Sequence, residues 1–247
     1  VLFMDSNSSF NNFSIVIPIY NEEDILEESL NSIISICERT YLDYEIIISE
    51  NGSTDNTKSL AREFEQTNSR IILIESGNAN YGEALKRGFL ECKNEIIISF
   101  DIDYYSENFL KECLLLEEEY AGLIASKRLN SSEDGRRLIR KLATNFFVYL
   151  LKFLFKTKLS DTHGMKAIKK KFVNDHINLV ISTQDLFDTE LLLRIENSGV
   201  KFKEVPTKIN EIRPSVSVIY KRIPRTLKSL FKLKINFYKE SLNTKNL

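Results

Sequence analysis

The chain has 247 residues, 34 Lys and Arg against 35 Asp and Glu, and 43% hydrophobic residues, which is the composition of a globular protein. It contains no uninterrupted apolar run of about 18 residues, so we expect no membrane-spanning helix. The first residues lack the pattern of a signal peptide. Three widely spaced cysteines and two histidines make a disulfide scaffold or a zinc module improbable, and a reducing cytosol fits best.

Charge is distributed unevenly along the chain. Residues 1–126 carry 8 basic and 24 acidic groups, whereas residues 127–247 carry 26 basic and 11 acidic groups. Such asymmetry usually marks an interaction surface. An anionic membrane surface or a phosphorylated ligand explains the basic end, and no nucleic-acid-binding motif accompanies it, so we expect no nucleic-acid partner.

The first half alternates short apolar runs with helical patterns. The runs are rich in Ile and Val without period-2 alternation, which is typical of strands buried on both faces of a parallel sheet. The predicted strands are residues 13–19, 44–49, 70–75, 95–100 and 122–126, and the predicted helices are residues 22–38, 55–66, 81–92 and 106–119. Ser53 and Asp55, and later Ser106, stand where helix N-caps are found. This order predicts an open, mostly parallel, twisted α/β sheet with helices on both faces.

A helix predicted at residues 136–155 is almost entirely apolar toward its end. It is too short to span a bilayer and is either a core helix or one that lies against a membrane interface. Aromatic residues in such a helix belong to the core more often than they contact lipid. On that ground we expect buried positions for Phe146, Phe147, Tyr149, Phe153 and Phe155.

The remaining elements are predicted from hydrophobic periodicity and from the Gly and Pro residues that end helices and strands. A helix at residues 186–197 ends before Gly199, and a strand at residues 200–205 is closed by Pro206. A basic helical pattern at residues 218–238, interrupted by Pro224, would suit an anionic bilayer. We divide the chain into an N-terminal tail (1–12), a main domain (13–217) and a basic amphipathic C-terminal segment (218–247).

Polar residues gather where three predicted strands end. They are Pro18, Tyr20, Asn21 and Glu22 after the first strand, Glu50 and Asn51 after the second, and Asp101, Ile102 and Asp103 after the fourth. The carboxyl ends of parallel strands meet at one edge of a sheet, so these groups converge on one crevice. Two carboxylates separated by one residue suit Mg²⁺ or Mn²⁺ holding a diphosphate.

These motifs resemble those of the family 2 glycosyltransferases, which adopt the GT-A fold. The matching segments are residues 15–22, 51–55, 78–88 and 101–103. Residues 126–128, 161–166, 187–192 and 204–206, with Arg137 and Asn145, make the chain most similar to the dolichol- or polyprenol-phosphate mannose or glucose synthases. The resemblance covers roughly residues 13–230.

The resemblance implies roles for individual residues. Pro18, Tyr20, Asn21, Glu22, Glu50, Asn51 and Ile102 would line the nucleotide-sugar pocket, Asp101 and Asp103 would hold Mg²⁺ or Mn²⁺ and the diphosphate, and Arg128, Arg137 and Arg213 would meet phosphates. Guanidinium groups match phosphate oxygens bidentately. Asp103, Arg128 and Asp161 are the expected catalytic residues.

The implied reaction is inversion at the anomeric carbon of a nucleotide sugar of the GDP-mannose or UDP-glucose type. A polyprenyl or dolichyl phosphate acceptor is already largely anionic and needs positioning, whereas a glycan hydroxyl needs a general base, for which Asp161 is the candidate. Glu50-Asn51 replaces the family's usual Asp-Asp, and residues 161–166 are one residue shorter than usual, so the donor stays open.

A rival interpretation from another class is a non-catalytic scaffold that binds a nucleotide sugar. Intact Asp101 and Asp103 argue against it. A nicotinamide dehydrogenase is disfavoured because no Gly-x-Gly-x-x-Gly follows the first strand.

Overall fold

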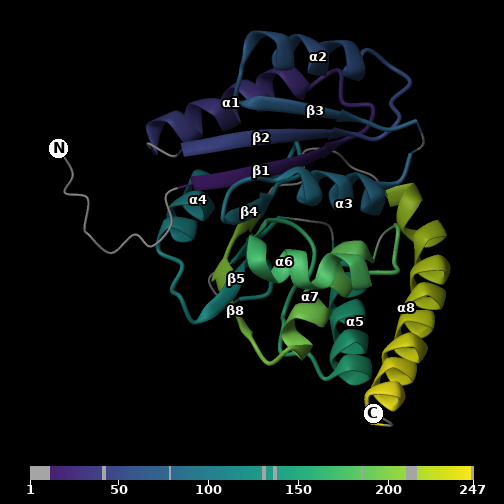
Figure 1. The fold of residues 1–247 in the computed structure, drawn as a ribbon. Helices are drawn as coiled ribbons and strands as arrows, with labels where there is room; N and C mark the ends of the chain where they lie inside the picture. The colour runs from purple at the N-terminus through teal and green to yellow at the C-terminus, as the bar shows by residue number, and fades with distance from the viewer. Residues whose placement is uncertain are drawn as a thin grey trace.

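The computed structural model describes residues 12–40, 43–77, 79–129, 132–135, 138–184, 186–209 and 216–245, and in this part a seven-stranded sheet carries helices on both faces (Figure 1). The strands of the sheet are β1 (Asn12–Ile19), β2 (Asp43–Glu50), β3 (Ile71–Glu75), β4 (Ile96–Ser99), β5 (Tyr120–Ser126), β7 (Lys166–Lys169) and β8 (Lys201–Pro206). A separate pair is formed by β6 (Glu133–Asp134) and β9 (Lys208–Ile209). The helices are α1 (Leu26–Arg39), α2 (Thr57–Thr67), α3 (Tyr81–Glu91), α4 (Glu107–Leu114), α5 (Leu138–Phe155), α6 (Lys170–His176), the short 3₁₀ helix η1 (Ile177–Leu179), α7 (Phe187–Asn197) and α8 (Val216–Lys245).

The strand order of the sheet is β3-β2-β1-β4-β7-β5-β8. Strands β3, β2, β1 and β4 run parallel, and β5 and β8 are parallel to each other. Strand β7 lies between β4 and β5 and is antiparallel to both. The expected mostly parallel α/β sheet is confirmed. Strand β7 was not predicted, because Lys-Ala-Ile-Lys is too short and too charged to read as a buried strand.

Side chains that alternate along β1 build two separate cores. Ile15 and Ile17 pack with α1, α2 and α4 on one face, and Val16 packs with α3, α6 and α7 on the other. Both faces are therefore apolar, which explains the uninterrupted Ile and Val runs. The three cysteines are buried in the described structure, and burial raises the pKa of Cys37 to about 12.

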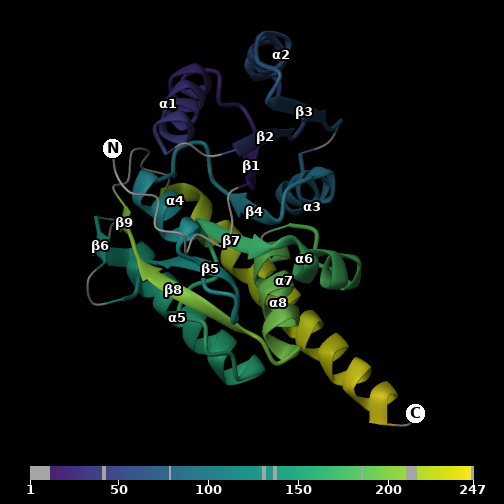
Figure 2. The ribbon, with the colours of Figure 1, turned by 60° about the vertical axis from the view of Figure 1, so that its left-hand side comes forward.

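Helices α5 and α8 form a third layer, packed against α7 (Figures 1 and 2). Leu151 of α5, Leu193 of α7 and Leu230 of α8 share one apolar cluster. The rings of Phe155 and Phe237 lie 5.4 Å apart in an edge-to-face contact. Arg194 of α7 also donates through both terminal nitrogens to the Glu240 carboxylate of α8, at 2.9 and 3.1 Å.

Most predicted elements agree with the structure to within two residues at each end, and the predicted cap at Ser106 and the helix end before Gly199 are confirmed. Ser106 Oγ accepts from the backbone N–H of Phe109, and Gly199 has φ +91° after α7. Asp55 Oδ1 accepts from the N–H of Thr57, but the N-cap of α2 is Asn56, which makes no side-chain cap hydrogen bond. Ser53 Oγ instead accepts from the N–H of Asn21.

Three helix boundaries were wrong. The first helix begins at Leu26 rather than residue 22, because residues 22–25 form a turn closed by bonds to the Glu22 carbonyl. Helix α4 ends at Leu114 rather than residue 119, because the chain turns so that Leu116 reaches the core. Helix α8 spans Val216–Lys245 rather than residues 218–238, and it continues through Pro224, although proline cannot donate a helical hydrogen bond.

The expected burial of the aromatic residues of α5 is wrong for three of the five. Phe147 and Phe155 pack into the third layer. Phe146, Tyr149 and Phe153 are instead 57%, 68% and 71% exposed. They lie on the side of α5 opposite the residues that pack against α7, and there they stay largely exposed.

None of the described helices is long and apolar enough to cross a membrane. The proposed boundary between residues 217 and 218 stays a prediction. The predicted tail is outside the described residues apart from Asn12, which begins β1.

Gly122 provides a test of the central sheet. A Cβ at this position of β5 would lie 2.1 Å from the carbonyl oxygen of Ala167 in β7. We expect Gly122→Ala to lower the free energy of unfolding by about 1–3 kcal/mol, measured by chemical denaturation. In Gly77→Ala the new Cβ meets nothing within 4 Å, so this control should stay within about 0.5 kcal/mol of the wild type. Equal stability of the two variants would contradict the pairing of β5 with β7.

Candidate active site

The loops after β1 and β2 are joined by polar side chains at the carboxyl edge of the sheet. Asn21 has φ +53°, its N–H donates to Ser53 Oγ at 3.0 Å, and its side-chain oxygen accepts from the N–H of Thr54 at 2.8 Å. The N–H of Glu22 donates to Thr57 Oγ1 at 2.7 Å. Asn is among the residues that tolerate a positive φ, which explains its place in this turn. These contacts bring the two loops into one rigid rim.

Glu50 stabilises the loop after β2 by accepting hydrogen bonds from it. The residue is completely buried, its Oε1 accepts from the N–H of Ser53, and its Oε2 lies 3.4 Å from Lys58 Nζ. Burial alone would raise the pKa of Glu50, but hydrogen bonds from Ser53 and Gly52 and the charge of Lys58 outweigh it, and the pKa is lowered. The carboxylate is therefore ionised and committed to its own loop.

Asn51 connects this loop to helix α3. Its side-chain oxygen accepts from the N–H of Asn80 at 2.5 Å. Asn80 is the N-cap of α3, and its own side chain accepts from the N–H of Glu83. The amide of Asn51 thus fixes the first turn of α3, including Tyr81, against the end of β2.

Asp101 and Asp103 follow β4 in a tight turn. The N–H of Tyr104 donates to the carbonyl of Asp101 at 2.9 Å. Ile102, which stands between the two aspartates in the sequence, buries its side chain in the core. Asp103 is exposed, whereas Asp101 is partly buried and accepts from the Tyr81 hydroxyl at 3.1 Å. The buried isoleucine anchors the turn, so both acidic side chains stay at the sheet edge.

Electrostatics at this turn are dominated by acidic groups. Burial raises the pKa of Asp101, and the charges of Asp103 and Asp188 raise it further. Lys166 and the hydrogen bond from Tyr81 oppose this increase, but the net pKa stays above the usual value. The pKa of Tyr81 is also raised well above its ordinary range, first by desolvation of its hydroxyl and then by the charge of Asp101, although 36% of the residue is exposed.

A buried ion pair lies within electrostatic reach of Asp101. Lys166 of β7 donates to Asp188 Oδ2 of α7 at 2.6 Å, and the two side chains are only 2% and 3% exposed. Asp188 Oδ1 is buried and has no hydrogen-bond partner within the described structure. Lys166 therefore compensates a group of carboxylates rather than one.

Basic residues stand after β5, beside the acidic turn. Arg128 is exposed and donates through NH1 to the side-chain oxygen of Asn145 on α5. Lys127 Nζ lies 3.4 Å from Asp161 Oδ2 and donates to the carbonyl of His163 at 3.0 Å. Asp161 is 2% exposed and also accepts from the backbone N–H groups of Lys127 and His163.

The structure brings most of the predicted site residues to one edge of the sheet. Tyr20 is 44% exposed there, while Pro18 and Ile102 are buried and offer the site only backbone atoms. Arg137 and Arg213 lie outside the described residues.

Four residues of the site received no role from sequence reasoning. They are Tyr81, Lys127, Lys166 and Asp188. Each lies in a segment that supports the family resemblance, but nothing in the local pattern says that Lys166 and Asp188 meet. Their contact depends on β7 entering the sheet beside β4.

The acidic turn suits a divalent cation that is shared with phosphate. The described residues contain no group of three His, Cys, Asp or Glu side chains arranged to hold a metal. Asp101 and Asp103 supply two hard oxygen ligands at most, with Asp103 exposed. Magnesium is commonly bound by one or two carboxylates that are completed by substrate phosphates and water, so the residues present fit such an ion.

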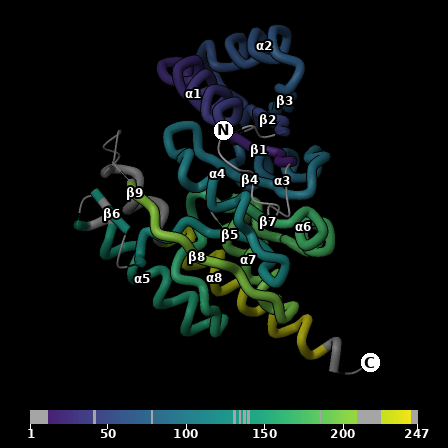
Figure 3. The backbone as a smooth tube through the Cα atoms, turned by 90° about the vertical axis from the view of Figure 1, so that its left-hand side faces the viewer, coloured from purple at the N-terminus to yellow at the C-terminus, as the bar shows by residue number. Residues whose placement is uncertain are grey.

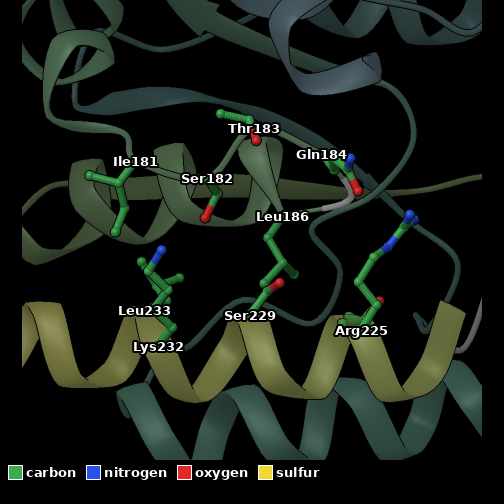
Figure 4. Close-up of a pocket in the computed structure, with 10 residues that line it drawn as sticks. Ile181, Ser182, Thr183, Gln184, Leu186, Arg225, Ser229, Lys232 and Leu233 are labelled. Carbon is green, nitrogen blue, oxygen red and sulfur yellow. The ribbon is translucent and has the colours of Figure 1, made fainter. Parts of the chain in front are cut away.

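A separate cleft of about 150 Å³ lies between residues 181–184, Leu186 and α8 (Figure 4). Arg225 and Lys232 of α8 line it together with Ser182 and Thr183. None of the site residues predicted from the sequence lines this cleft.

The chain matches one protein family and is similar to several sugar transferases. Residues 14–177 match the protein family described as glycosyl transferase family 2. The chain is 28% identical over 226 residues to a dolichyl-phosphate beta-glucosyltransferase (ALG5D) of Trichomonas vaginalis, covering 82% of this chain and 67% of the relative. It is 32% identical over 129 residues to an undecaprenyl-phosphate 4-deoxy-4-formamido-L-arabinose transferase of Pseudomonas fluorescens, covering 50% of this chain and 37% of that protein.

Solved structures agree with the fold. Glucosyl-3-phosphoglycerate synthase from Mycobacterium tuberculosis, in complex with Mn²⁺, UDP and phosphoglyceric acid, superposes with a TM-score of 0.67 at 19% identity, over 91% of this chain and 78% of the other. The mannosyltransferase PcManGT from Pyrobaculum calidifontis, in complex with GDP-Man and Mn²⁺, gives 0.61 at 21% identity, over 86% and 60%. The expected GT-A fold is confirmed.

The ion pair beside Asp101 can be tested by a double-mutant cycle. Lys166→Met leaves the carboxylate of Asp188 buried without its partner, so we expect it to lower the free energy of unfolding by about 3–5 kcal/mol. Adding Asp188→Leu removes the stranded charge and should recover much of the loss. Chemical denaturation of the two single variants and the double variant measures the coupling. Purely additive effects would show that the two charges do not depend on each other.

The raised pKa of Asp101 predicts a pH dependence. Its folded value exceeds its unfolded value, so the group contributes stability below the unfolded pKa that is lost as pH rises through the folded pKa. Asp101→Asn cannot ionise and keeps an acceptor for Tyr81. We expect this variant to be more stable than the wild type at neutral pH, with the difference vanishing below about pH 3.8. Thermal unfolding over this pH range measures it, and a less stable variant at neutral pH would contradict the assignment.

Proposed function

The chain belongs to glycosyl transferase family 2 and is a glycosyltransferase, and from this premise we propose that it transfers a hexose, with inversion, from a nucleotide sugar to a polyprenyl or dolichyl phosphate. The donor is of the GDP-mannose or UDP-glucose type. The chain spans about two thirds of the first curated relative and 37% of the second, so this activity is proposed for the described site rather than taken from their names.

The observation that carries the proposal is the acidic turn after β4. Asp101 is held by Tyr81, and Asp103 stands exposed beside the joined loops of β1 and β2. Asp101 and Asp103 would hold Mg²⁺ or Mn²⁺, which when bound supplies positive charge to the leaving diphosphate. Tyr20, Asn21 and the loop of Glu50 would border the nucleotide. Pre-organised groups of this kind need no rearrangement as charge develops.

The environment of Asp161 favours a phosphate acceptor. A hydroxyl acceptor needs a base that reaches its proton, within about 3 Å. Asp161 is 2% exposed, and both its oxygens are engaged by Lys127 and by backbone N–H groups. A phosphate acceptor needs no deprotonation, and Arg128 is an exposed cation next to the same segment. A glycan hydroxyl acceptor remains the alternative within the same fold, and a non-catalytic nucleotide-sugar-binding scaffold is the alternative from another class.

The proposed acceptor implies a place of action. A lipid-linked phosphate sits in a membrane, and we propose that the protein is peripheral on the cytoplasmic face, attracted by anionic lipids. The basic second half of the chain supports this location.

A transfer assay tests the proposed reaction. Labelled GDP-mannose, UDP-glucose and UDP-N-acetylglucosamine are each incubated with the protein, a short-chain polyprenyl phosphate and Mg²⁺ or Mn²⁺. We expect label to enter the organic phase with one donor and Asp103→Ala to reduce the rate by at least about 100-fold, because the charge of the leaving diphosphate is then poorly compensated.

Asp43→Ala is the matched control, since Asp43 is a carboxylate with 78% side-chain exposure at the opposite end of β2. It should leave the rate unchanged. Metal-dependent donor hydrolysis without transfer would move the proposal to a hydroxyl acceptor. Nucleotide-sugar binding without any turnover would support the scaffold.

A further inference from the structure

Helix α5 carries a continuous stripe of exposed apolar side chains. Leu138, Leu142, Phe146, Tyr149 and Phe153 are 77%, 66%, 57%, 68% and 71% exposed. Their spacing of three and four residues puts them on one side of the helix. Opposite side chains of the same helix, Val148 and Leu151, are buried. Isolated exposed apolar residues are ordinary, but five large ones in line on one helix are not.

Helix α8 carries a second stripe with the same geometry. Phe231, Ile235, Tyr238 and Leu242 are 53%, 54%, 61% and 42% exposed, again at spacings of three and four residues. This is not the face that holds the helix to the protein. Leu230 and Leu233 do that, with exposures of 0% and 1%.

The two stripes belong to one face of the molecule. Helices α5 and α8 lie side by side in the third layer, where Phe155 touches Phe237 and Lys234 Nζ lies 5.5 Å from the centre of the Phe155 ring (Figures 1 and 3). Their buried sides share a cluster with α7, so both exposed stripes point away from α7. In Figure 3 this pair of helices lies at the end of the molecule opposite α1 and α2.

The two helices that carry the stripes are strongly basic in sequence. Residues 138–155 contain three basic residues and no acidic residue, and residues 216–245 contain eight basic residues and one acidic residue. That acidic residue, Glu240, is paired with Arg194 of α7. Lys152, Lys234 and Lys239 are exposed on the same helices as the two stripes.

We infer that the α5–α8 face, which consists of the two apolar stripes and the lysines beside them, is a membrane-docking surface for an anionic bilayer. The two apolar stripes insert at the headgroup boundary, and the lysines lie against the lipid phosphates. Apolar insertion and electrostatic attraction are the two components of interfacial binding. A symmetric pair of two copies through this face would bring two strongly basic surfaces together, which like charges oppose.

The proposed docking also explains the position of the acceptor site, and it rests in this respect on the proposed function. Asn145 lies next to Phe146 on α5, and it accepts the hydrogen bond from Arg128. Arg128, which we assign to the acceptor phosphate, is thus held by α5, the helix that would lie in the membrane interface. A lipid phosphate at the membrane surface would meet Arg128 without leaving the headgroup layer.

Vesicle sedimentation tests the surface directly. The protein is mixed with vesicles of phosphatidylcholine alone or of phosphatidylcholine and phosphatidylglycerol, and we expect binding to the anionic vesicles that weakens with salt. The variant Phe146→Ser/Tyr149→Ser/Phe153→Ser should bind at least about tenfold more weakly. The matched control Leu90→Ser/Leu115→Ser/Leu179→Ser removes residues that are 52%, 62% and 53% exposed on other elements and should bind as the wild type does.

Single tryptophans provide a second readout that does not depend on the triple variant folding, because the chain contains no Trp. Phe153→Trp and Phe231→Trp should shift their emission to shorter wavelength on anionic vesicles and be quenched by brominated lipid. Leu115→Trp should do neither.

Two results would overturn the inference. One is equal vesicle binding by the wild type and the face variant, together with tryptophan emission that brominated lipid leaves unquenched in the Phe153→Trp and Phe231→Trp proteins. The other is a wild-type dimer in solution that the face variant converts to a monomer, which would make the face a contact between copies. Transfer to a water-soluble short-chain isoprenyl phosphate, measured for both proteins, reports on the proposed function separately. Activity in solution without vesicle binding would refute only the docking surface.

Discussion

The arrangement of the site depends on placing several carboxylates close together at the edge of a sheet. Asp101, Asp103 and Asp188 repel one another, and the sheet edge can hold them only with positive charge nearby. Lys166 of β7 provides this positive charge, with its Nζ 2.6 Å from Asp188 Oδ2 and within electrostatic reach of Asp101. Removing one member of a buried pair usually costs more than the pair contributes, so this contact ties β7 and α7 to the end of β4.

Polar residues near the site are used largely to hold the loops, and this determines which groups remain available. Glu50 Oε1 accepts from Ser53 and the Asn51 side chain accepts from Asn80, and both residues are buried, so they shape the rim rather than project from it. Asp103 and Tyr20 are exposed at the same rim. Strong internal hydrogen bonding with a few exposed groups is the pattern expected where geometry must be fixed before a ligand arrives.

The third layer extends this arrangement from the sheet to the outer surface. Helix α7 contributes Asp188 to the ion pair in its first turn and Arg194 to Glu240 of α8 further along. The same short helix therefore links the acidic turn to the α5–α8 face. Arg128 makes a second link, from the end of β5 to Asn145 of α5. The α5–α8 face is thus connected to the site by direct side-chain contacts, through Arg194 and through Arg128.

By itself the sequence determined six of the seven strands of the main sheet, because runs such as residues 13–19 are apolar enough to be buried on both faces, and it determined that their polar ends meet at one edge. Only the tertiary structure decided the rest. Strand β7 has no local signal, since its lysines are buried through partners distant in the chain. Periodicity shows that Phe146 and Phe153 share a face of α5, but whether that face is covered depends on where α7 and α8 pack. Local pattern fixes which side chains point together, and only packing fixes what they meet.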